Sequence, residues 1–385
     1  MVNAIILAGG YGTRLRPITC SIPKPMMPVL NKPLLNFIIS KLLQEIPLNK
    51  VIIAVNYRAH DIEAYMREWQ KELNCEIHVQ DERKPLGTGG ALKFSQALLE
   101  DDSFFMLNGD VVSFFSYTNM LEQHKETNAM ATISAIRVPD VSRYGVLVSD
   151  EDSNLIRDFY EKPRTTELIK KYSIYPVNAG TYLLEPAIFD FMEPDKKVSI
   201  EKDVFPKVAQ QGVAYKFEFS GIWKDFGLPE EYLAGNFIIL DEETKRLGVE
   251  NIIDASVEIG EGTMITPPVC FDHGVKIGAN CNIGPNVILG SDVQIGNEVT
   301  INESVFLENC YIENNNDISR VIMGDGVKTG QGVHLVGPAI MGSNVYVEDQ
   351  VTLIAASNQT IKICPWVTLT VESVENASSN GAFIH

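Results

Sequence analysis

Several features are scarce or missing in this sequence, and each absence excludes a class of protein. The 385-residue chain has no run of about 18 uncharged apolar residues, the pattern expected of a membrane-spanning helix. Its first residues lead into an apolar, strand-like segment without a basic leader, so we expect no secretory signal. None of the six cysteines forms a CxxC pair and no histidines cluster beside them, which argues against a zinc site or a disulfide framework. Scattered single thiols are typical of the cytosol, and we expect a cytoplasmic protein.

Positive charge is also scarce. The chain has 32 Lys and Arg against 50 Asp and Glu, for a formal net charge of −18. A chain this acidic repels nucleic acid and anionic membranes, so we expect neither as a partner. Any anionic substrate must meet a local group of cations or a metal ion.

The chain is long enough for two cores, and its two parts differ in pattern. Up to about residue 240, short apolar strands alternate with segments of helical spacing, beginning with a strand at 4–7 and a helix at 34–43. This alternation predicts crossover units around a mostly parallel sheet. We expect a domain over residues 1–240, a linker over 241–250 and a second domain over 251–385.

The second domain has a period of six residues. An apolar residue recurs at every sixth position, from Ile253 and Ile259 onward to Leu307, and glycine often follows it. Such a short period is typical of a solenoid. It resembles the hexapeptide repeat of left-handed parallel β-helices, in which three hexapeptides form one coil. The period slips at the polar residues 314–317, where we expect a loop inserted between coils.

The cations are concentrated behind the first strand. The segment LAGGYGTRLRP (7–17) is followed by Pro23, Lys24 and Pro25, and it includes Arg14 and Arg16. Glycines allow backbone N–H groups to approach phosphate closely, while Arg and Lys bind phosphate oxygens. The segment lacks the Gly-Lys-Ser/Thr of a P-loop, and Leu15 replaces the third glycine of a dinucleotide-binding fingerprint.

This segment resembles the signature of the sugar-phosphate nucleotidyltransferases, or nucleotide-sugar pyrophosphorylases, and the resemblance is nearest to the mannose-1-phosphate guanylyltransferases. It covers almost the whole chain, because several family members have a C-terminal hexapeptide β-helix. It implies an α/β, Rossmann-like nucleotidyltransferase domain before that β-helix. Further segments match in order: LGTGGA (86–91), NGD (108–110), YG (144–145), EKP (161–163), NAG (178–180), SIEK (199–202) and WKDFG (223–227).

The resemblance assigns roles to individual residues. Arg14 and Lys24 would be catalytic, and Asp110 and Asp225 would bind Mg2+. The sugar phosphate would contact Gly145, Glu161, Lys162 and Asn178. The nucleotide would contact Leu7, Ala8, Gly9, Gly10, Gly12, Thr13, Gln80, Gly87, Thr88, Asn108 and Gly109. Two departures from the family pattern concern the metal site: no acidic residue closely follows Asp110, and Leu228 stands where the family usually has Thr.

The expected reaction joins a nucleoside triphosphate to a sugar 1-phosphate and releases pyrophosphate. Because the attacking phosphate is already ionised near neutral pH, no general base is required, and the six histidines are indeed scattered. GTP and mannose 1-phosphate are the leading substrates, and a thymidylyl- or uridylyltransferase for glucose 1-phosphate is the alternative. The pair Gly89–Gly90 also resembles heptose-phosphate guanylyltransferases.

Two alternatives of other classes remain. A catalytically silent regulatory subunit would keep the fold, although such subunits tend to lose the Arg or Lys of the signature. An acyltransferase centred on the β-helix would use His273 or His334 as its base. For the β-helix itself, which lacks a phosphate-binding signature, we expect a role in homo-oligomer assembly and support of the first domain, without a contribution to chemistry.

Overall fold

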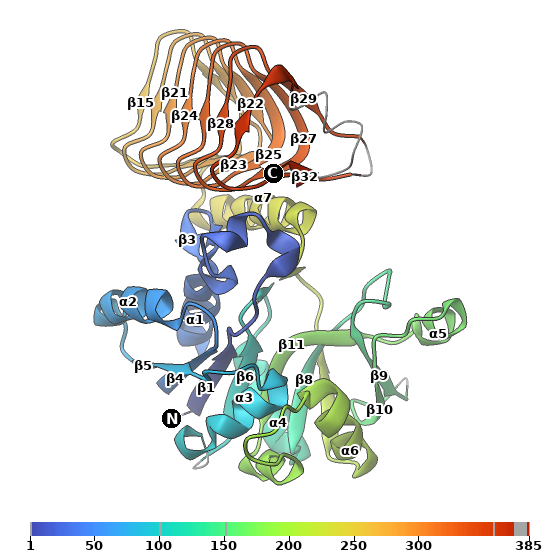
Figure 1. Cartoon of the computed structure of the whole chain (residues 1–385). Coiled ribbons are helices and arrows are strands. Elements are labelled where there is room, and N and C mark those ends of the chain that lie inside the picture. The colour runs from blue at the N-terminus through green and yellow to red at the C-terminus, as the bar shows by residue number, and fades with distance from the viewer. Residues whose placement is uncertain (1, 100–101, 151, 357–358, 373–382, 385) are drawn as a thin grey trace. The chain divides into compact units, whose positions relative to one another are not determined.

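The computed structural model describes residues 2–99, 102–150, 152–356, 359–372 and 383–384 (Figure 1). The chain divides into two compact units, and each of them joins segments that are distant in sequence. The first unit comprises Met1–Gly10 and Leu35–Lys224, and the second comprises Tyr11–Leu34 and Asp225–His385. The segment with Arg14 and Lys24 therefore belongs to the same unit as the C-terminal half of the chain.

A nine-stranded mixed sheet forms the centre of the first unit. Its main path runs β10-β9-β11-β6-β1-β4-β5, and β8 pairs with both β11 and β12. Strands β6, β1, β4 and β5 are parallel to one another, whereas β11 is antiparallel to β6 and β8. The strands are β1 (Val2–Leu7), β4 (Leu48–Val55), β5 (Glu76–Asp81), β6 (Phe104–Asn108), β8 (Ala131–Ile136), β9 (Gly145–Ser149), β10 (Ile156–Glu161), β11 (Val177–Leu184) and β12 (Ala214–Glu218).

Helices connect these strands as crossover units. They are α1 (Leu34–Glu45), α2 (Ala59–Trp69), α3 (Gly87–Phe94), α4 (Tyr117–Thr127), α5 (Thr166–Tyr172) and α6 (Phe205–Gln210). Buried Ile, Leu, Phe and Ala side chains of the sheet pack against α3 and α6 in the main core of this unit. The predicted alternation of strands and helices is confirmed. The antiparallel strands β9 to β11 extend it beyond a purely parallel sheet.

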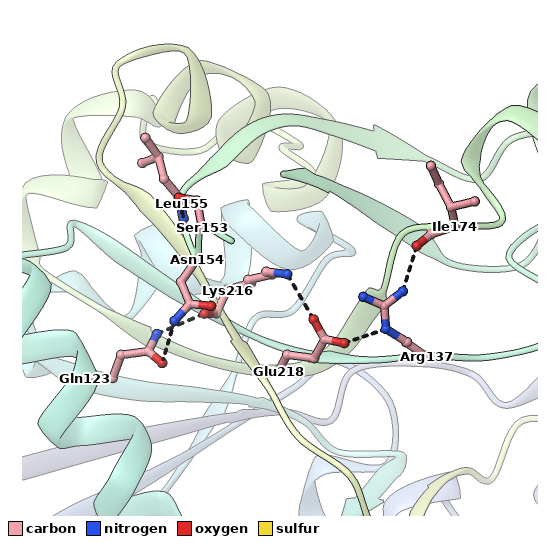
Figure 2. A network of polar contacts seen from close by, with 8 residues as sticks. All are labelled: Gln123, Arg137, Ser153, Asn154, Leu155, Ile174, Lys216 and Glu218. Atoms are coloured by element: carbon pink, nitrogen blue, oxygen red, sulfur yellow. Dashed lines mark hydrogen bonds and ion pairs between the residues drawn. The ribbon is translucent and has the colours of Figure 1, made fainter. Parts of the chain in front are cut away.

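A polar network secures the outer strand pair β8–β12 (Figure 2). Lys216, which is almost fully buried, pairs with Glu218 at 2.9 Å, and Arg137 Nε donates to the other carboxylate oxygen at 2.7 Å. Arg137 also donates to the carbonyl of Ile174, and Gln123 donates to that of Lys216. Burial acts to raise the pKa of Glu218, but Lys216 and Arg137 outweigh it and lower the pKa.

The second unit contains a parallel β-helix with three strands per coil. One face stacks β15, β18, β21, β24, β26, β28 and β31, which run from Glu258–Ile259 to Thr368–Leu369. The other two faces are joined into one twelve-stranded sheet, because β25 (Asp317–Met323) and β27 (His334–Met341) are long enough to turn a corner. The remaining members of that sheet are β14 (Ile252–Ile253), β16 (Met264–Ile265), β17 (Val269–Phe271), β19 (Asn282–Ile283), β20 (Val287–Leu289), β22 (Thr300–Asn302), β23 (Ser304–Phe306), β29 (Thr352–Ile354), β30 (Ile361–Ile363) and β32 (Phe383–Ile384).

The fold class expected from the hexapeptide period is confirmed as a parallel β-helix, and its left-handed sense stays a prediction. The loop expected at residues 314–317 is wrong. Lys276 pairs with Gln294, eighteen residues on, but Tyr311 pairs with Lys328, seventeen residues on, so the coil that contains residues 314–317 is shorter rather than longer. The real insertion lies later, because Met341 pairs with Ile363, twenty-two residues on.

The interior of the β-helix is a continuous stack of apolar side chains, including Ile277, Ile283, Leu289 and Ile301. The first two apolar residues of the six-residue period do not belong to this buried stack, because Ile253 and Ile259 are 39% and 44% exposed. Their strands, β14 and β15, stand at the ends of their sheet paths. The first coil therefore leaves apolar surface at its end of the stack.

Helix α7 (Pro229–Leu247) lies against β25 and β27 of the β-helix (Figure 1). It contains most of the expected linker over 241–250, so that the connection between helix and first strand is only 248–251. Gly248 ends the helix in a left-handed conformation (φ 69°), which glycine adopts without strain. The expected domain limits at 240 and 251 stay a prediction. None of the helices in the described part of the chain is long and apolar enough to cross a membrane.

Candidate active site

The first unit places one row of candidate residues at the carboxyl edge of its parallel strands. Leu7 of β1 pairs with Asn108 of β6 and with Ala54 of β4, and Ala54 pairs with Gln80 of β5. Four strands thus end level with one another. In open α/β sheets, this edge is where ligands bind.

Tight turns follow two of these strands. The N–H of Gly109 donates to Leu7 O at 2.9 Å, and a Cβ on Gly109 would lie 2.8 Å from that oxygen. Asp110 comes next, at the start of the turn into β7 (Val111–Ser113). Strand β7 pairs with β13 (Trp223–Asp225), and Phe114 N donates to Ile222 O beside it. Asp225 is the last residue of β13, where the second unit resumes.

The half-buried Asn108 and Asn178 form one polar group with the buried Tyr182. Asn178 Nδ2 donates to the Tyr182 hydroxyl at 2.8 Å, and its Oδ1 accepts from Gly180 N at 2.9 Å. Gly180 has a φ of 82°, and a Cβ there would lie 2.8 Å from Asn108 Nδ2. Burial, followed by the nearby charge of Glu201, raises the pKa of Tyr182. The phenol therefore stays neutral and orients both amides.

Glu161, Lys162 and Gly145 lie together at paired positions of β9 and β10. Glu161 pairs with Gly145 across the two strands, and a Cβ on Gly145 would lie 2.8 Å from Glu161 Oε2. The carboxylate is half-buried and bonds Lys162 at 3.2 Å, with Lys162 in a left-handed conformation (φ 53°). Burial raises the pKa of Glu161, although Lys162 opposes this. The structure thus brings together three of the four residues expected to contact the sugar phosphate.

Gly87 and Thr88 are the first residues of α3, rather than part of a loop. Thr88 Oγ1 donates to Glu201 Oε2 at 2.7 Å and accepts from Ile200 N at 2.9 Å. Ser199 donates to the same glutamate oxygen. The hydroxyl of Thr88 therefore joins the start of α3 to residues 199–201.

The side chain of Gln80 is engaged within the protein. Its Nε2 donates to Phe94 O at 3.1 Å, and its Oε1 accepts from Ser95 at 2.6 Å. A shallow cavity beside it is lined by residues 78–84 and Phe94. Glu82 in that lining is 6% exposed, and burial raises its pKa to about 7.

The second unit holds the remaining candidates. Gly12 has a φ of 61°, and its carbonyl accepts from Thr19 Oγ1 at 2.8 Å, which folds the glycine turn back on the segment. Lys24 is only 7% exposed. A Cβ on Gly227 would lie 2.9 Å from Asp225 Oδ1 and 3.0 Å from Arg14 Nη2, so the absence of a side chain there leaves room for both groups.

Sequence reasoning missed several polar residues at these positions. Tyr182 and Glu82 belong to no motif, and Glu201 was noted only as part of one. Asn56 follows β4, and a Cβ on Gly9 would lie 3.0 Å from its Nδ2. The one available signal was position, since Asn56 and Glu82 directly follow strands that end at the same edge.

Candidate residues at the carboxyl edge of an open α/β sheet, in a chain that also forms a parallel β-helix, indicate an α/β enzyme that binds its ligand at this edge. Comparison with known proteins identifies the family. Residues 3–242 match the family model described as nucleotidyl transferase, and residues 265–378 match the GMPPB C-terminal domain. The chain therefore belongs to the nucleotidyl transferase family, and it is a sugar-1-phosphate nucleotidyltransferase.

Relatives match over nearly the whole chain. Mannose-1-phosphate guanylyltransferase catalytic subunit beta of Xenopus tropicalis is 37% identical over 92% of this chain and 95% of its own length. Mannose-1-phosphate guanyltransferase of Pichia angusta is 36% identical over 91% and 93%. Among solved structures, HddC from Yersinia pseudotuberculosis complexed with GMP-PN is 31% identical, with a TM-score of 0.52 over 62% of this chain and all of that one.

We expect Gly109→Ala to lower the free energy of unfolding by about 1–3 kcal/mol, because its Cβ would press on the carbonyl of Leu7. Gly10→Ala is the matched control, since no described atom lies within 4 Å of a Cβ there. The control should unfold like the wild type but bind nucleotide more weakly, as the backbone of Gly10 is a proposed nucleotide contact. Thermal unfolding and titration calorimetry measure the two effects. Equal destabilisation by both substitutions would contradict the prediction.

Proposed function

We propose that the protein is a guanylyltransferase that forms GDP-mannose and pyrophosphate from GTP and mannose 1-phosphate. The observation that carries this proposal is the 33–37% identity to proteins named mannose-1-phosphate guanylyltransferase over more than 90% of both chains. In the reaction, a phosphate oxygen of the sugar phosphate bonds to the α-phosphorus of GTP. The bond from that phosphorus to the oxygen bridging the β-phosphate breaks, and pyrophosphate leaves with the electron pair.

The difficulty of this reaction is electrostatic, since one anion attacks another. Catalysis then depends on alignment and on neutralising charge, rather than on proton transfer. We propose that Arg14 stabilises the departing pyrophosphate, and that Lys24 and Lys162 hold phosphate groups in line. Buried Lys24 would be a fixed point charge, whereas Lys162 is about half exposed and oriented by Glu161.

We propose that the nucleotide binds along the carboxyl edge and the glycine turn. Leu7, Ala8, Gly9, Gly10, Asn108 and Gly109 would contribute chiefly backbone and amide groups there, and Gly12 and Thr13 would contribute from the signature segment. Gly87 and Thr88 would present the start of α3 to it. Gln80 lines the shallow cavity that also includes Glu82, and we propose it as a nucleotide contact for this reason. Its amide is also hydrogen-bonded to Phe94 and Ser95. The sugar phosphate would contact Gly145, Glu161, Lys162 and Asn178.

A divalent metal fits the proposed chemistry, and we propose Mg2+ with Asp110 and Asp225 as its ligands. Among the described residues, no three ligating side chains are grouped as a protein-only metal site. Two carboxylates suit magnesium, which is usually bound by one or two carboxylates together with substrate phosphates and water. When bound, the ion neutralises phosphate charge. The assignment rests on the two motifs and on this ligand chemistry.

We also propose a cytoplasmic location, as the sequence predicts. All six cysteines are free thiols in the structure, and Cys270, Cys281 and Cys310 are buried in the β-helix. Burial raises the pKa of Cys270 and Cys310 to about 12, so they stay protonated and unreactive. Free thiols of this kind suit a reducing compartment.

A matrix of substrates tests the proposed function. GTP with mannose 1-phosphate should give the highest kcat/KM for pyrophosphate release among GTP, dTTP, UTP and ATP, each paired with mannose, glucose and heptose 1-phosphates. Higher kcat/KM with dTTP or UTP and glucose 1-phosphate would favour the alternative enzyme. No release with any pair would favour a regulatory subunit.

We expect Asp110→Asn and Asp225→Asn each to reduce kcat by at least about a hundredfold at limiting magnesium, because each removes one negative charge from the proposed ligand set. Asp158→Asn, at an exposed position of β10, is the matched control and should retain activity. Unfolding temperatures report whether each variant folds. Near-wild-type activity of either variant at limiting magnesium would refute that residue as a ligand.

For the β-helix we propose self-association through its first coil. Strands β14, β15 and β16 stand at the ends of their sheet paths, and Met264 and Ile259 are 65% and 44% exposed. A parallel stack that ends in open strand edges and apolar side chains favours burial against a second copy.

Met264→Glu should therefore reduce the subunit count measured by light scattering, because it places a charge in the proposed interface. Trp366→Glu is the matched control: it adds the same charge at an equally exposed apolar residue of the last coil. Dissociation by Trp366→Glu, with no effect of Met264→Glu, would place the interface at the other end of the stack.

A further inference from the structure

The signature segment, residues 11–34, has little regular structure of its own. It consists of short 3-10 turns and the two-residue strands β2 (Pro28–Val29) and β3 (Lys32–Pro33). Its far end is held by the rest of the second unit. Asn31 Nδ2 donates to Leu289 O of the β-helix at 2.9 Å, and Leu30 N donates to Asn236 Oδ1 of α7 at 3.1 Å.

The catalytic end of the segment has its own contact with the β-helix. Lys362, in the middle of β30, donates from Nζ to the carbonyl of Arg14 at 3.0 Å. Two residues earlier, the hydroxyl of Thr360 donates to Glu230 in the first turn of α7. One strand of the β-helix thus reaches both the proposed leaving-group arginine and the helix that begins after Asp225.

The carbonyl of Arg14 lies near the end of the 3-10 helix Thr13–Leu15, where the last carbonyls of a helix have no donor within that helix. The turn Thr13–Leu15 makes hydrogen bonds from Leu15 N to Gly12 O and from Arg16 N to Thr13 O. The carbonyl of Arg14 follows these two acceptors, and a lysine beside the last carbonyls of a helix is favourable both as a donor and by charge. Burial lowers the pKa of Lys362, while the nearby charge of Glu230 opposes this shift.

The pairing register changes just before strand β30. The pairing from β27 to β30 spans twenty-two residues, whereas Met323 pairs with Met341, eighteen residues on. The four additional residues lie between Ile354 and Ile361, directly before Lys362.

We propose that Lys362 is a positioning residue for nucleotidyl transfer: from the β-helix, it fixes the backbone of Arg14 and thereby the direction of the guanidinium. The β-helix would then have a role in the reaction besides assembly, which differs from the expectation drawn from the sequence. The inference rests on the proposed function of Arg14 at the leaving pyrophosphate. It does not depend on which base or sugar is used.

The test compares Lys362→Met with wild type in steady-state kinetics and in hydrogen exchange of residues 11–16. Loss of the hydrogen bond should lower kcat about tenfold, because a charged donor makes a stronger hydrogen bond than a neutral one and solvent screens part of that effect. Both KM values should stay within about twofold, because a positioning defect acts mainly in the transition state. Exchange at 11–16 should accelerate without a change elsewhere.

Three further variants separate positioning from a merely structural role. Lys362→Arg keeps a cationic donor and should recover most of kcat. Lys328→Met removes a lysine from β26, which lies in the ladder between β24 and β28, and should leave kcat unchanged. In an Arg14→Ala background, Lys362→Met should have almost no further effect on kcat, because the group it positions is gone.

Wild-type kcat and wild-type exchange in Lys362→Met would overturn the proposal, as would an equal loss in Lys328→Met or an additive loss in the Arg14→Ala background. If the substrate matrix selects another nucleotide and sugar phosphate, the kinetics are measured with that substrate pair, and the same outcomes support or contradict the role of Lys362. If no pair reacts, the proposed function fails, and the exchange of residues 11–16 alone decides whether Lys362 holds the segment.

Discussion

Repulsion between anions is the constraint on which this structure depends. An acidic chain must hold a nucleoside triphosphate and a sugar 1-phosphate, and two of the three cations proposed for that purpose, Arg14 and Lys24, lie in residues 11–34. That segment has five prolines and begins with the turn at Gly12, so it lacks long helices or strands with which to build a core of its own. It must therefore obtain rigidity from its neighbours: Asn236 of α7, the carbonyl of Leu289 and Lys362.

The first unit meets the same constraint with backbone geometry. Parallel strands that end level with one another expose N–H groups and turn residues at one edge, and Asn108 continues that row into a neutral amide and phenol group with Asn178 and Tyr182. Neutral groups there orient a ligand without adding negative charge. Two carboxylates of this region are paired within the protein: Glu161 forms an ion pair with Lys162, and Glu201 accepts a hydrogen bond from Thr88.

Sequence patterns that reflect the periodic burial of apolar side chains predicted the fold well. The six-residue period identified the β-helix because every sixth side chain enters the same interior stack. The error at 314–317 has a physical cause: Asn316 is polar but 2% exposed, and its amide bonds Thr329, Gly330 O and Val333 N inside the coil. Composition cannot distinguish such a satisfied amide from a loop. Contacts such as Lys362 to Arg14, 348 residues apart, leave no local pattern at all.

The two proposed roles of the β-helix use opposite ends of one stack. Self-association involves the first coil, with Met264, whereas the contact with Arg14 comes from β30, near the last coil. In a solenoid each coil contacts only its neighbours, so a disturbance at one end must pass through every intervening coil to reach the other. Between the two ends the interior is a continuous stack, apolar at Ile283, Leu289 and Ile301 and with a hydrogen-bonded amide at Asn316, and such packing offers no second arrangement to switch into. Assembly and positioning should therefore behave as nearly independent properties of the same domain.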